Sequence, residues 1–216
     1  GEEALMATYS MEAYTDDCLV RFFTKDSSYA FALDANPHPF GRSDTQSGGG
    51  WYYQGSGMRF KNVTIAQGAT IVAAYLACKC GQANSETVIR SRITGDDEDN
   101  AAAWTTLADF QSRRGTVVGG ADNSKITTAQ VDWDSIAAWS LNTIYNSPSI
   151  VSIIQEIVNR VGWASGNSLA LWIDDYNQRS DIAAVRNPYS FDVGGATAVQ
   201  LIVTTPTPRS RAYIID

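Results

Sequence analysis

Apolar and polar residues alternate most clearly in residues 57–80, GMRFKNVTIAQGATIVAAYLACKC. Residues 57–65 alternate with a period of two, which predicts a strand. The turn residues Gln67 and Gly68 follow, and residues 70–80 predict a second strand, so we expect a central hairpin. Both faces of the second strand are mostly apolar or small, which is typical of a central strand. Its core face is expected to carry Val72, Ala74, Leu76, Cys78 and Cys80.

Shorter segments with the same period predict further strands on both sides of this hairpin. Residues 25–50 are rich in glycine, proline and polar residues, so a long loop is expected there. Trp51, Tyr52 and Tyr53 follow it as an edge strand or a loop tip. A second polar loop is expected from Trp104 to Gly120. The further strands are predicted near residues 18–24, 85–94, 125–133, 168–174, 182–185 and 198–204.

One helix is predicted, from Pro148 to Arg160. Ser147 is expected to be its N-cap, with Pro148 at the first helical position. Gly162 suits the position just after the C-terminal end. A broad apolar face predicts that the helix docks on the rest of the fold. That face consists of Ile150, Val151, Ile153, Ile154, Ile157, Val158 and Val161.

About nine short strands with one helix predict an all-β protein, an antiparallel β-sandwich of jelly-roll type with one docked α-helix at about residues 148–160. The length of 216 residues fits one domain, assigned to residues 1–205. Residues 1–56 of that domain would form an N-terminal strand and the long loop. Residues 206–216 are expected to form a C-terminal arm. Its segment Ala212-Tyr213-Ile214-Ile215 is suited to extend a sheet edge, either within the domain or on a neighbour.

The charge and composition exclude several classes of protein. The net charge is -7 and no basic cluster is present, which argues against nucleic-acid binding. No apolar stretch reaches the 18 or so residues of a spanning helix, so no membrane insertion is expected. Residues 1–5 are interpreted as an addition before a natural start at Met6, without an export signal. An exported protein with its signal removed is the alternative.

The three cysteines do not form a disulfide framework. Cys78 and Cys80 lie two apart on one predicted strand, a poor geometry for bridging each other. We expect buried free thiols. A bridge from Cys18 to one of the other two is the alternative.

No motif for nucleophilic, phosphate-binding or dinucleotide chemistry is present, so no enzyme activity and no certain cofactor are expected. The only histidine, His38, lies between two prolines and is expected in a surface loop. Paired carboxylates for glycoside hydrolysis cannot be placed across a cleft from the sequence.

The acidic run Asp96, Asp97, Glu98, Asp99 and Asn100 is the candidate metal site. Closely spaced oxygen ligands beside a glycine suit calcium, and Asp96, Asp97 and Asp99 are the expected ligands. The alternative is a solvated loop that keeps a strand end soluble. The acidic pairs Asp174-Asp175 and Asp16-Asp17 would join such a site or cap strands.

The candidate glycan-binding patch is Trp51, Tyr52 and Tyr53, beside a run of glycines. Flat aromatic rings stack on the apolar faces of sugars, which is the basis of this expectation. The alternative is that the three rings pack under the long loop as a satellite of the core.

One stretch runs from Met58-Arg59-Phe60 through residues 63–71 to Ala74-Tyr75-Leu76, and a second spans residues 153–169. Together these two stretches resemble the DNRLRE-type β-sandwich modules. The resemblance covers residues 57 to about 175 loosely, while the first 50 residues match no pattern of the group. It implies a β-sandwich with a docked helix that binds glycans or decorates larger assemblies without catalysis. Such a resemblance specifies a fold and does not supply a chemistry.

Two function classes are therefore expected. The first is a non-catalytic virion structural protein of phage tail, decoration or head-fibre type, forming homo-oligomers with other virion or surface-assembly proteins. The second is a glycan-binding module of a secreted or cell-surface protein. The corresponding localisations are the virion and the extracellular space. The two overlap wherever a virion protein binds a host-surface glycan.

Overall fold

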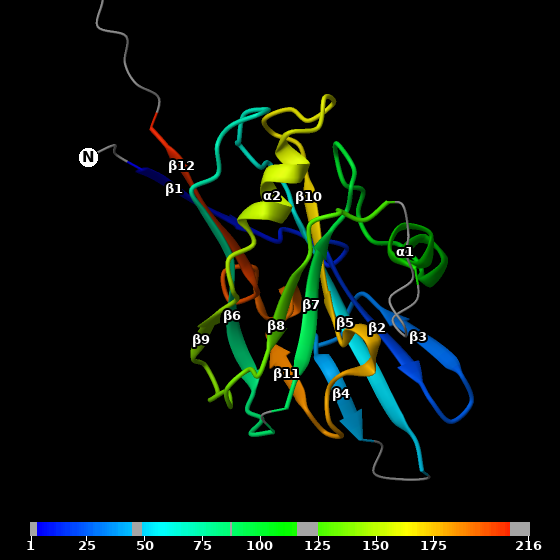
Figure 1. Ribbon diagram of the computed structural model, residues 1–216. Helices are drawn as coiled ribbons and strands as arrows, with labels where there is room; N and C mark the ends of the chain where they lie inside the picture. The colour runs from blue at the N-terminus through cyan, green and yellow to red at the C-terminus, as the bar shows by residue number, and fades with distance from the viewer. Residues whose placement is uncertain (1–3, 45–48, 87, 116–124, 208–216) are drawn as a thin grey trace, which may run out of the picture.

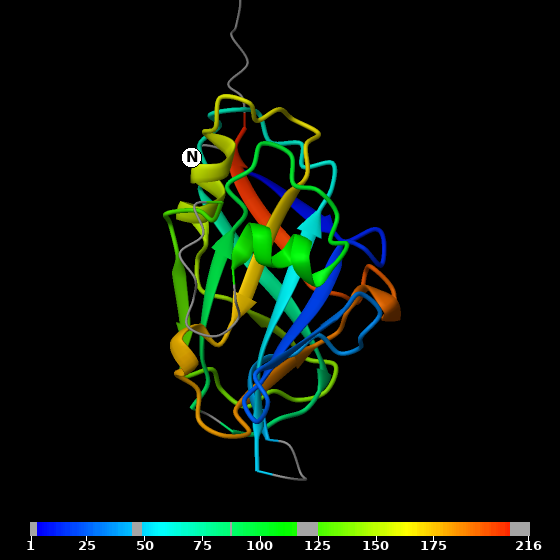
Figure 2. The same ribbon diagram turned by 90° about the vertical axis from the view of Figure 1, so that its right-hand side faces the viewer.

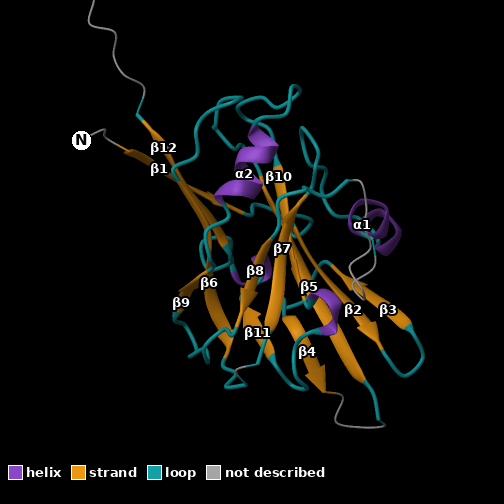
Figure 3. Cartoon of the chain, viewed as in Figure 1, coloured by secondary structure: helices purple, strands orange, loops and turns teal. Residues whose placement is uncertain are grey.

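The computed structural model describes residues 4–44, 49–86, 88–115 and 125–207. Across this part of the chain, twelve mostly antiparallel strands and two short α-helices confirm the expected all-β sandwich (Figure 1; Figure 3). The helices are α1 (Leu107–Arg114) and α2 (Val151–Val158), and two 3-10 turns are η1 (Tyr176–Gln178) and η2 (Phe191–Val193). The strands are β1 (Ala4–Ser10), β2 (Asp17–Phe23), β3 (Ser28–Ala32), β4 (Phe40–Asp44), β5 (Trp51–Phe60), β6 (Ala73–Gln82), β7 (Arg90–Gly95), β8 (Val131–Asp134), β9 (Ile144–Asn146), β10 (Leu169–Asp174), β11 (Val185–Pro188) and β12 (Gln200–Pro206).

The hydrogen-bonded strands follow one path, β1-β12-β6-β11-β4-β5-β10-β7-β8, which folds over into two layers (Figure 1). β9 extends one layer beside β6, and β2 joins the other beside β5, with β3 beyond it. β11 belongs to both layers, because Val185 and Arg186 pair with β4 whereas Asn187 and Pro188 pair with β6. The two layers are therefore parts of one sheet that turns at β11.

The main hydrophobic core lies between the two layers and is closed by α2. The core face of β6 is the one that its alternation predicts, since Ala74, Leu76, Cys78 and Cys80 are all buried. Val72 precedes the strand and is exposed instead. All three cysteines of the chain are free and buried, as expected.

β10 is buried on both faces, because a second apolar cluster covers the outer face of its layer. Leu171 belongs to the main core, and Trp172 belongs to the outer cluster. Figure 2 shows α1, in green, lying across the strands of this layer. The buried members of the outer cluster are Cys18, Val20, Tyr53, Ala101, Trp104, Phe110, Ala170 and Trp172.

The expected hairpin between residues 57 and 80 is wrong. Both strands exist as β5 and β6, but β5 pairs with β2, β4 and β10, whereas β6 pairs with β9, β11 and β12. Residues 61–72 cross from one layer to the other instead of making a tight turn. Each strand gains more burial in the middle of its own layer than the two would gain as an isolated pair.

The predicted helix is shorter than expected, since α2 covers only Val151–Val158. Its N-cap is Ile150, while Ser147 accepts a hydrogen bond from the Leu76 amide and donates one to the Pro148 carbonyl. The helix ends before Val161, whose side chain is 98% exposed and lies outside the apolar face. No helix in the described ranges is long and apolar enough to span a membrane.

Two expected loops contain regular structure. The expected loop at residues 25–50 includes β3 and β4. The expected loop that follows Trp104 contains α1, which begins after the N-cap Thr106, whose side chain accepts a hydrogen bond from the Asp109 amide. His38 is buried in the interior and is not a surface-loop residue. These segments were hard to recognise because their burial depends on contacts with strands that are distant in sequence.

Candidate functional site

An open depression of about 790 Å³ lies where the two layers separate beside β11. One layer contributes side chains from β2, β4 and β5, and the other contributes the end of β6 and β11. The segment 35–39 forms a further wall. Its lining is rich in amides, to which Arg21 and Asp44 add one charged group of each sign. The lining residues are Arg21, Ala35, Asn36, Pro37, Pro39, Ser43, Asp44, Tyr52, Gln54, Gln82, Asn84, Ala183, Val185 and Asn187.

The depression forms because the inner face of β5 changes from apolar to polar along the strand. Phe60 and Met58 belong to the main core, while Ser56, Gln54 and Tyr52 continue the same face toward the depression. Polar side chains on this face remain accessible to solvent only where the opposite layer does not cover them. The change from apolar to polar residues along β5 therefore marks the boundary between the main core and the depression.

The floor of the depression is held by hydrogen bonds between polar side chains. The Arg21 Nε donates to Gln54 Oε1 at 2.8 Å, and Gln54 is itself buried. Burial lowers the pKa of the Arg21 guanidinium below its ordinary value. Tyr52 packs against Phe23, with ring centroids 4.8 Å apart. An aromatic ring thus adjoins a fixed group of hydrogen-bonding side chains.

The wall at residues 35–39 is fixed from behind. The Ser56 hydroxyl lies within hydrogen-bonding distance of the His38 and Pro39 carbonyl oxygens, at 2.8 and 3.0 Å. The His38 amide donates to the Pro188 carbonyl at 3.1 Å. Behind the wall, His38 Nδ1 lies 3.4 Å from Asp17 Oδ2 in the interior. The wall is therefore attached to both layers of the sandwich.

The chain matches no protein-family model and no curated protein. The candidate site is therefore interpreted from its own chemistry.

The three residues of the expected glycan-binding patch do not lie together. Tyr52 lines the depression, whereas Trp51 and Tyr53 lie on the opposite face of β5 with the outer apolar cluster. The Arg42 guanidinium covers those two rings, at 4.1 Å from the Trp51 centroid and 5.5 Å from the Tyr53 centroid. Alternation along one strand separates neighbouring aromatic residues in this way.

The three expected calcium ligands are each paired with arginine. Asp96 is buried and accepts from Arg113, while Asp97 and Asp99 accept from Arg160, whose Nε lies 2.7 Å from Asp99 Oδ1. Burial raises the Asp96 pKa, and the Arg113 charge opposes that rise. In the described ranges, no group of three or more His, Cys, Asp and Glu side chains is arranged to bind a metal ion. The geometry favours ion pairs at these aspartates.

The other acidic pairs serve different parts of the fold. Asp16 accepts from Arg59 Nη1 at 2.7 Å and is completely buried. Asp174 accepts from Arg114 Nη2 at 3.0 Å beneath α1. Asp175 accepts from the Ser180 amide, and burial raises its pKa to about 6. None of these carboxylates lines the depression.

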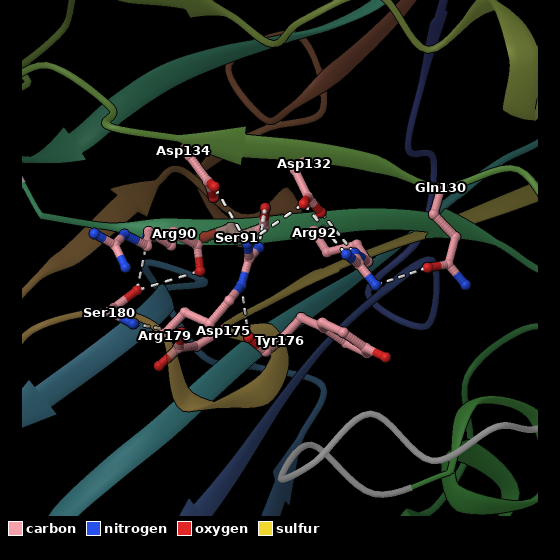
Figure 4. A network of polar contacts seen from close by, with 10 residues as sticks. All are labelled: Arg90, Ser91, Arg92, Gln130, Asp132, Asp134, Asp175, Tyr176, Arg179 and Ser180. Atoms are coloured by element: carbon pink, nitrogen blue, oxygen red, sulfur yellow. Dashed lines mark hydrogen bonds and ion pairs between the residues drawn. The ribbon is translucent and has the colours of Figure 1, made fainter.

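A second polar network covers the outer face of β7 and β8 (Figure 4). Arg92 lies directly opposite Asp132 in the sheet, and its Nε donates to that carboxylate at 2.6 Å. Arg179 donates to both Asp132 and Asp134, and the Arg92 guanidinium lies 3.9 Å from the centre of the Tyr176 ring. The charges neutralise one another across the strands. This network therefore stabilises a sheet surface.

Sequence reasoning identified Tyr52 but missed the amides that share the depression with it. Asn36, Gln82 and Asn187 come from segments far apart in the sequence, and each alone is an ordinary polar residue. A possible signal was the polar end of the inner face of β5, at Gln54 and Ser56. These polar residues indicate a site only when the strands that lie beside and opposite β5 are known.

Proposed function

We propose that this chain is a non-catalytic glycan-binding β-sandwich module, with the amide-lined depression as its binding site. The observation that carries the proposal is the convergence of amide side chains with Tyr52 in one open concavity. An open shape suits a chain of sugar units better than it suits a small molecule, which would need an enclosed pocket. The resemblance to DNRLRE-type modules, which bind glycans or decorate assemblies, supports the same function.

The chemistry of the lining matches that of a sugar. Amides donate and accept hydrogen bonds at once, as sugar hydroxyls do. Tyr52 offers an apolar ring face with a polar tip, which suits the mixed surface of a pyranose ring. Arg21 adds one cationic group at the floor, where it can orient an acidic or hydroxyl substituent.

The lining supports recognition more than hydrolysis. Glycoside hydrolysis generally requires two carboxyl groups across the scissile bond. Asp44 is the only carboxylate among the described residues that line the depression. Asp17 and His38 lie behind the wall and do not reach its surface. This arrangement supports the proposal of a non-catalytic role.

Binding of the full chain to a panel of immobilised polysaccharides, followed by calorimetry with the best ligand, tests the proposal. Tyr52→Ala and Gln82→Ala are each expected to weaken binding at least tenfold. Trp51→Ala is the matched control, because Trp51 is the neighbouring aromatic residue on the opposite face of the strand. Loss of binding in Trp51→Ala with retention in Tyr52→Ala would place the site on the outer face. Absence of binding to every polysaccharide would contradict the proposal.

A virion structural role, of phage tail, decoration or head-fibre type, is the second candidate. It is supported by the outer edge of β1, which has no strand beside it among the described residues and offers backbone groups for assembly with other virion proteins. A homo-oligomer that binds no polysaccharide would favour this role, and polysaccharide binding would favour the first. The proposed localisation is the virion, with the extracellular space as the alternative.

A further inference from the structure

The strand β1 is the outermost strand of its layer and pairs only with β12 within the described chain. Figure 1 shows the two strands projecting together from the body of the sandwich. Two apolar side chains at the projecting end are exposed, Leu5 at 56% and Met6 at 66%. An exposed edge with apolar side chains is a site for adding another strand.

A groove of about 390 Å³ lies along the same end. One side is the face of β1 and β12 that carries Leu5, Ala7, Val203 and Thr205, and the other is the connection 64–70. This face is continuous with the main core, since Tyr9 and Leu201 farther along it are buried. The groove is therefore an uncovered continuation of the core.

The chain leaves β12 at the rim of this groove, through Thr205, Pro206 and Thr207. Pro208 follows in the sequence. Each proline fixes its own backbone angle and favours an extended residue before it. Alternating prolines therefore oppose a tight reversal into the groove of the same chain. Residues 208–216 are long enough to reach about 30 Å when extended.

The sequence of residues 208–216 suits an apolar strand edge on a molecule of negative net charge. Ala212-Tyr213-Ile214-Ile215 has high strand propensity. Arg209 and Arg211 outweigh Asp216, so this segment carries a net charge of +1, which leaves -8 on residues 1–207. Opposite charges favour the approach of this segment to the body of another molecule.

We propose that residues 212–215 of a second copy of this chain pair with the free edge of β1 and cover the groove. Tyr213 and Ile215 would share one face of the added strand, opposite Leu5 and Ala7. Each copy offers both an edge and a segment, so the contact can join two copies reciprocally or continue through several. This inference is independent of glycan binding.

Cysteine cross-linking between two differently substituted chains tests the proposal. One full-length chain carries Met6→Cys, and the other carries Ile214→Cys. After mixing and mild oxidation, a disulfide-linked heterodimer is expected as the main product. The native cysteines are buried, and burial raises the pKa of the Cys78 thiol to about 12, so they do not compete.

Ile182→Cys in place of Met6→Cys is the matched control, since Ile182 is also exposed, at 51%, but lies in the turn that precedes β11. Equal cross-linking of this control would overturn the proposal, because the contact would be non-specific. Absence of cross-linking with Met6→Cys would overturn it as well.

A chain that carries both Met6→Cys and Ile214→Cys tests whether residues 212–215 pair with β1 of a second copy or with β1 of their own chain. At high dilution, a monomeric internal cross-link would show that the segment covers its own edge, and the proposal would be wrong. Light scattering gives a second measurement. The full chain is expected to associate as its concentration rises, and a chain ending at Thr207 is expected to remain monomeric. Equal association of the two chains would contradict the proposal.

Discussion

His38 Nδ1 and Asp17 Oδ2 lie 3.4 Å apart behind the wall of the depression, and both side chains are buried. Burial raises the pKa of Asp17 to about 7 and lowers the pKa of His38 to about 3. Both shifts favour the uncharged forms. The cavity beside the pair has a volume of only about 10 Å³, so it offers little solvation to a charge. Between about pH 3 and 7, the folded pair is therefore a neutral acid beside a neutral imidazole.

The two shifts act on stability in opposite directions. The pKa of Asp17 is raised from 3.8, so the stability gained from its protonated form is lost as the pH rises through about 7. The pKa of His38 is lowered from 6.5, so the stability gained from its neutral form is lost as the pH falls through about 3. Between pH 4 and 6.5, roughly, both folded and unfolded pairs hold one proton, and the two effects cancel.

Replacing either His38 or Asp17 is expected to remove the cancellation, so that stability depends on pH through the residue that remains. His38→Gln should lose stability relative to wild type as the pH rises from about 3 to 6.5, by roughly 5 kcal/mol, since one pKa unit corresponds to about 1.4 kcal/mol. Asp17→Asn should gain stability relative to wild type as the pH rises from about 4 to 7. Urea unfolding across this pH range measures both slopes. The other buried acids are common to all three proteins and cancel in the differences. Parallel pH profiles for the three proteins would show that the pair is not the titrating element.

Arg186 is expected to contribute far more to stability than a surface arginine does. It is fully buried and donates to the carbonyl oxygens of Val185 at 2.8 Å, Glu86 at 2.7 Å, Ala137 at 3.1 Å, and Ile136. Arg186→Met leaves these acceptors without their donor, and each buried unpaired group costs about 1–3 kcal/mol. We therefore expect a loss of more than about 3 kcal/mol in urea unfolding.

Arg179→Met is the control for Arg186→Met, because Arg179 belongs to the partly exposed network of β7 and β8. Ion pairs in such positions contribute about 1 kcal/mol or less. Equal losses for the two variants would contradict the assigned role of Arg186 in joining β11 to the segments that contain Glu86 and Ile136.

The sequence predicted the elements whose pattern depends only on their own residues. β6, β10 and α2 each carry an apolar face of the correct period, and all three lie in the main core. The buried free cysteines followed from the same reasoning. Ser147 and Val161 were assigned incorrectly at the ends of the helix, because end positions depend on contacts made by neighbouring strands.

The pairing of strands and the depression could not be predicted in the same way. β5 and β6 are adjacent in sequence but lie in different layers, because each finds better partners elsewhere. His38 has polar and proline neighbours, yet its side chain is buried against Asp17. The depression combines β2, β5, β6 and β11, so no single segment contains its pattern. The pairing of strands, the burial of His38 and the depression all depend on contacts between segments that are distant in the sequence.

Calcium is expected to leave the melting temperature unchanged. Arg160 is paired with Asp97 and Asp99, and Arg113 is paired with Asp96, so the carboxylates already have cationic partners. Scanning calorimetry with millimolar calcium or with chelator measures the effect. A melting temperature that rises with calcium would indicate binding to the folded state and would favour the calcium site expected from the sequence. Magnesium at the same concentration controls for ionic strength.

Gly57 is expected to tolerate no side chain, because two residues of the outer cluster pack directly against its backbone. An added Cβ would lie 2.8 Å from Cys18 Sγ and 2.9 Å from the Trp104 ring. Trp104 is held in turn by the Arg113 guanidinium, 3.9 Å from its ring centre, so it cannot move away freely. Gly57→Ala should therefore lose about 1–3 kcal/mol of stability through overpacking.

A double-mutant cycle with Trp104→Leu separates this overpacking from a general preference for glycine in β5. If the collision with the ring is the cause, the combination of Gly57→Ala and Trp104→Leu should lose less stability than the sum of the two single changes, by about 0.5–3 kcal/mol. Urea unfolding followed by circular dichroism measures all four proteins without relying on tryptophan fluorescence, which Trp104→Leu itself alters. Simple additivity would show that the Trp104 ring does not require glycine at this position, and the outer cluster would then owe its packing to other contacts.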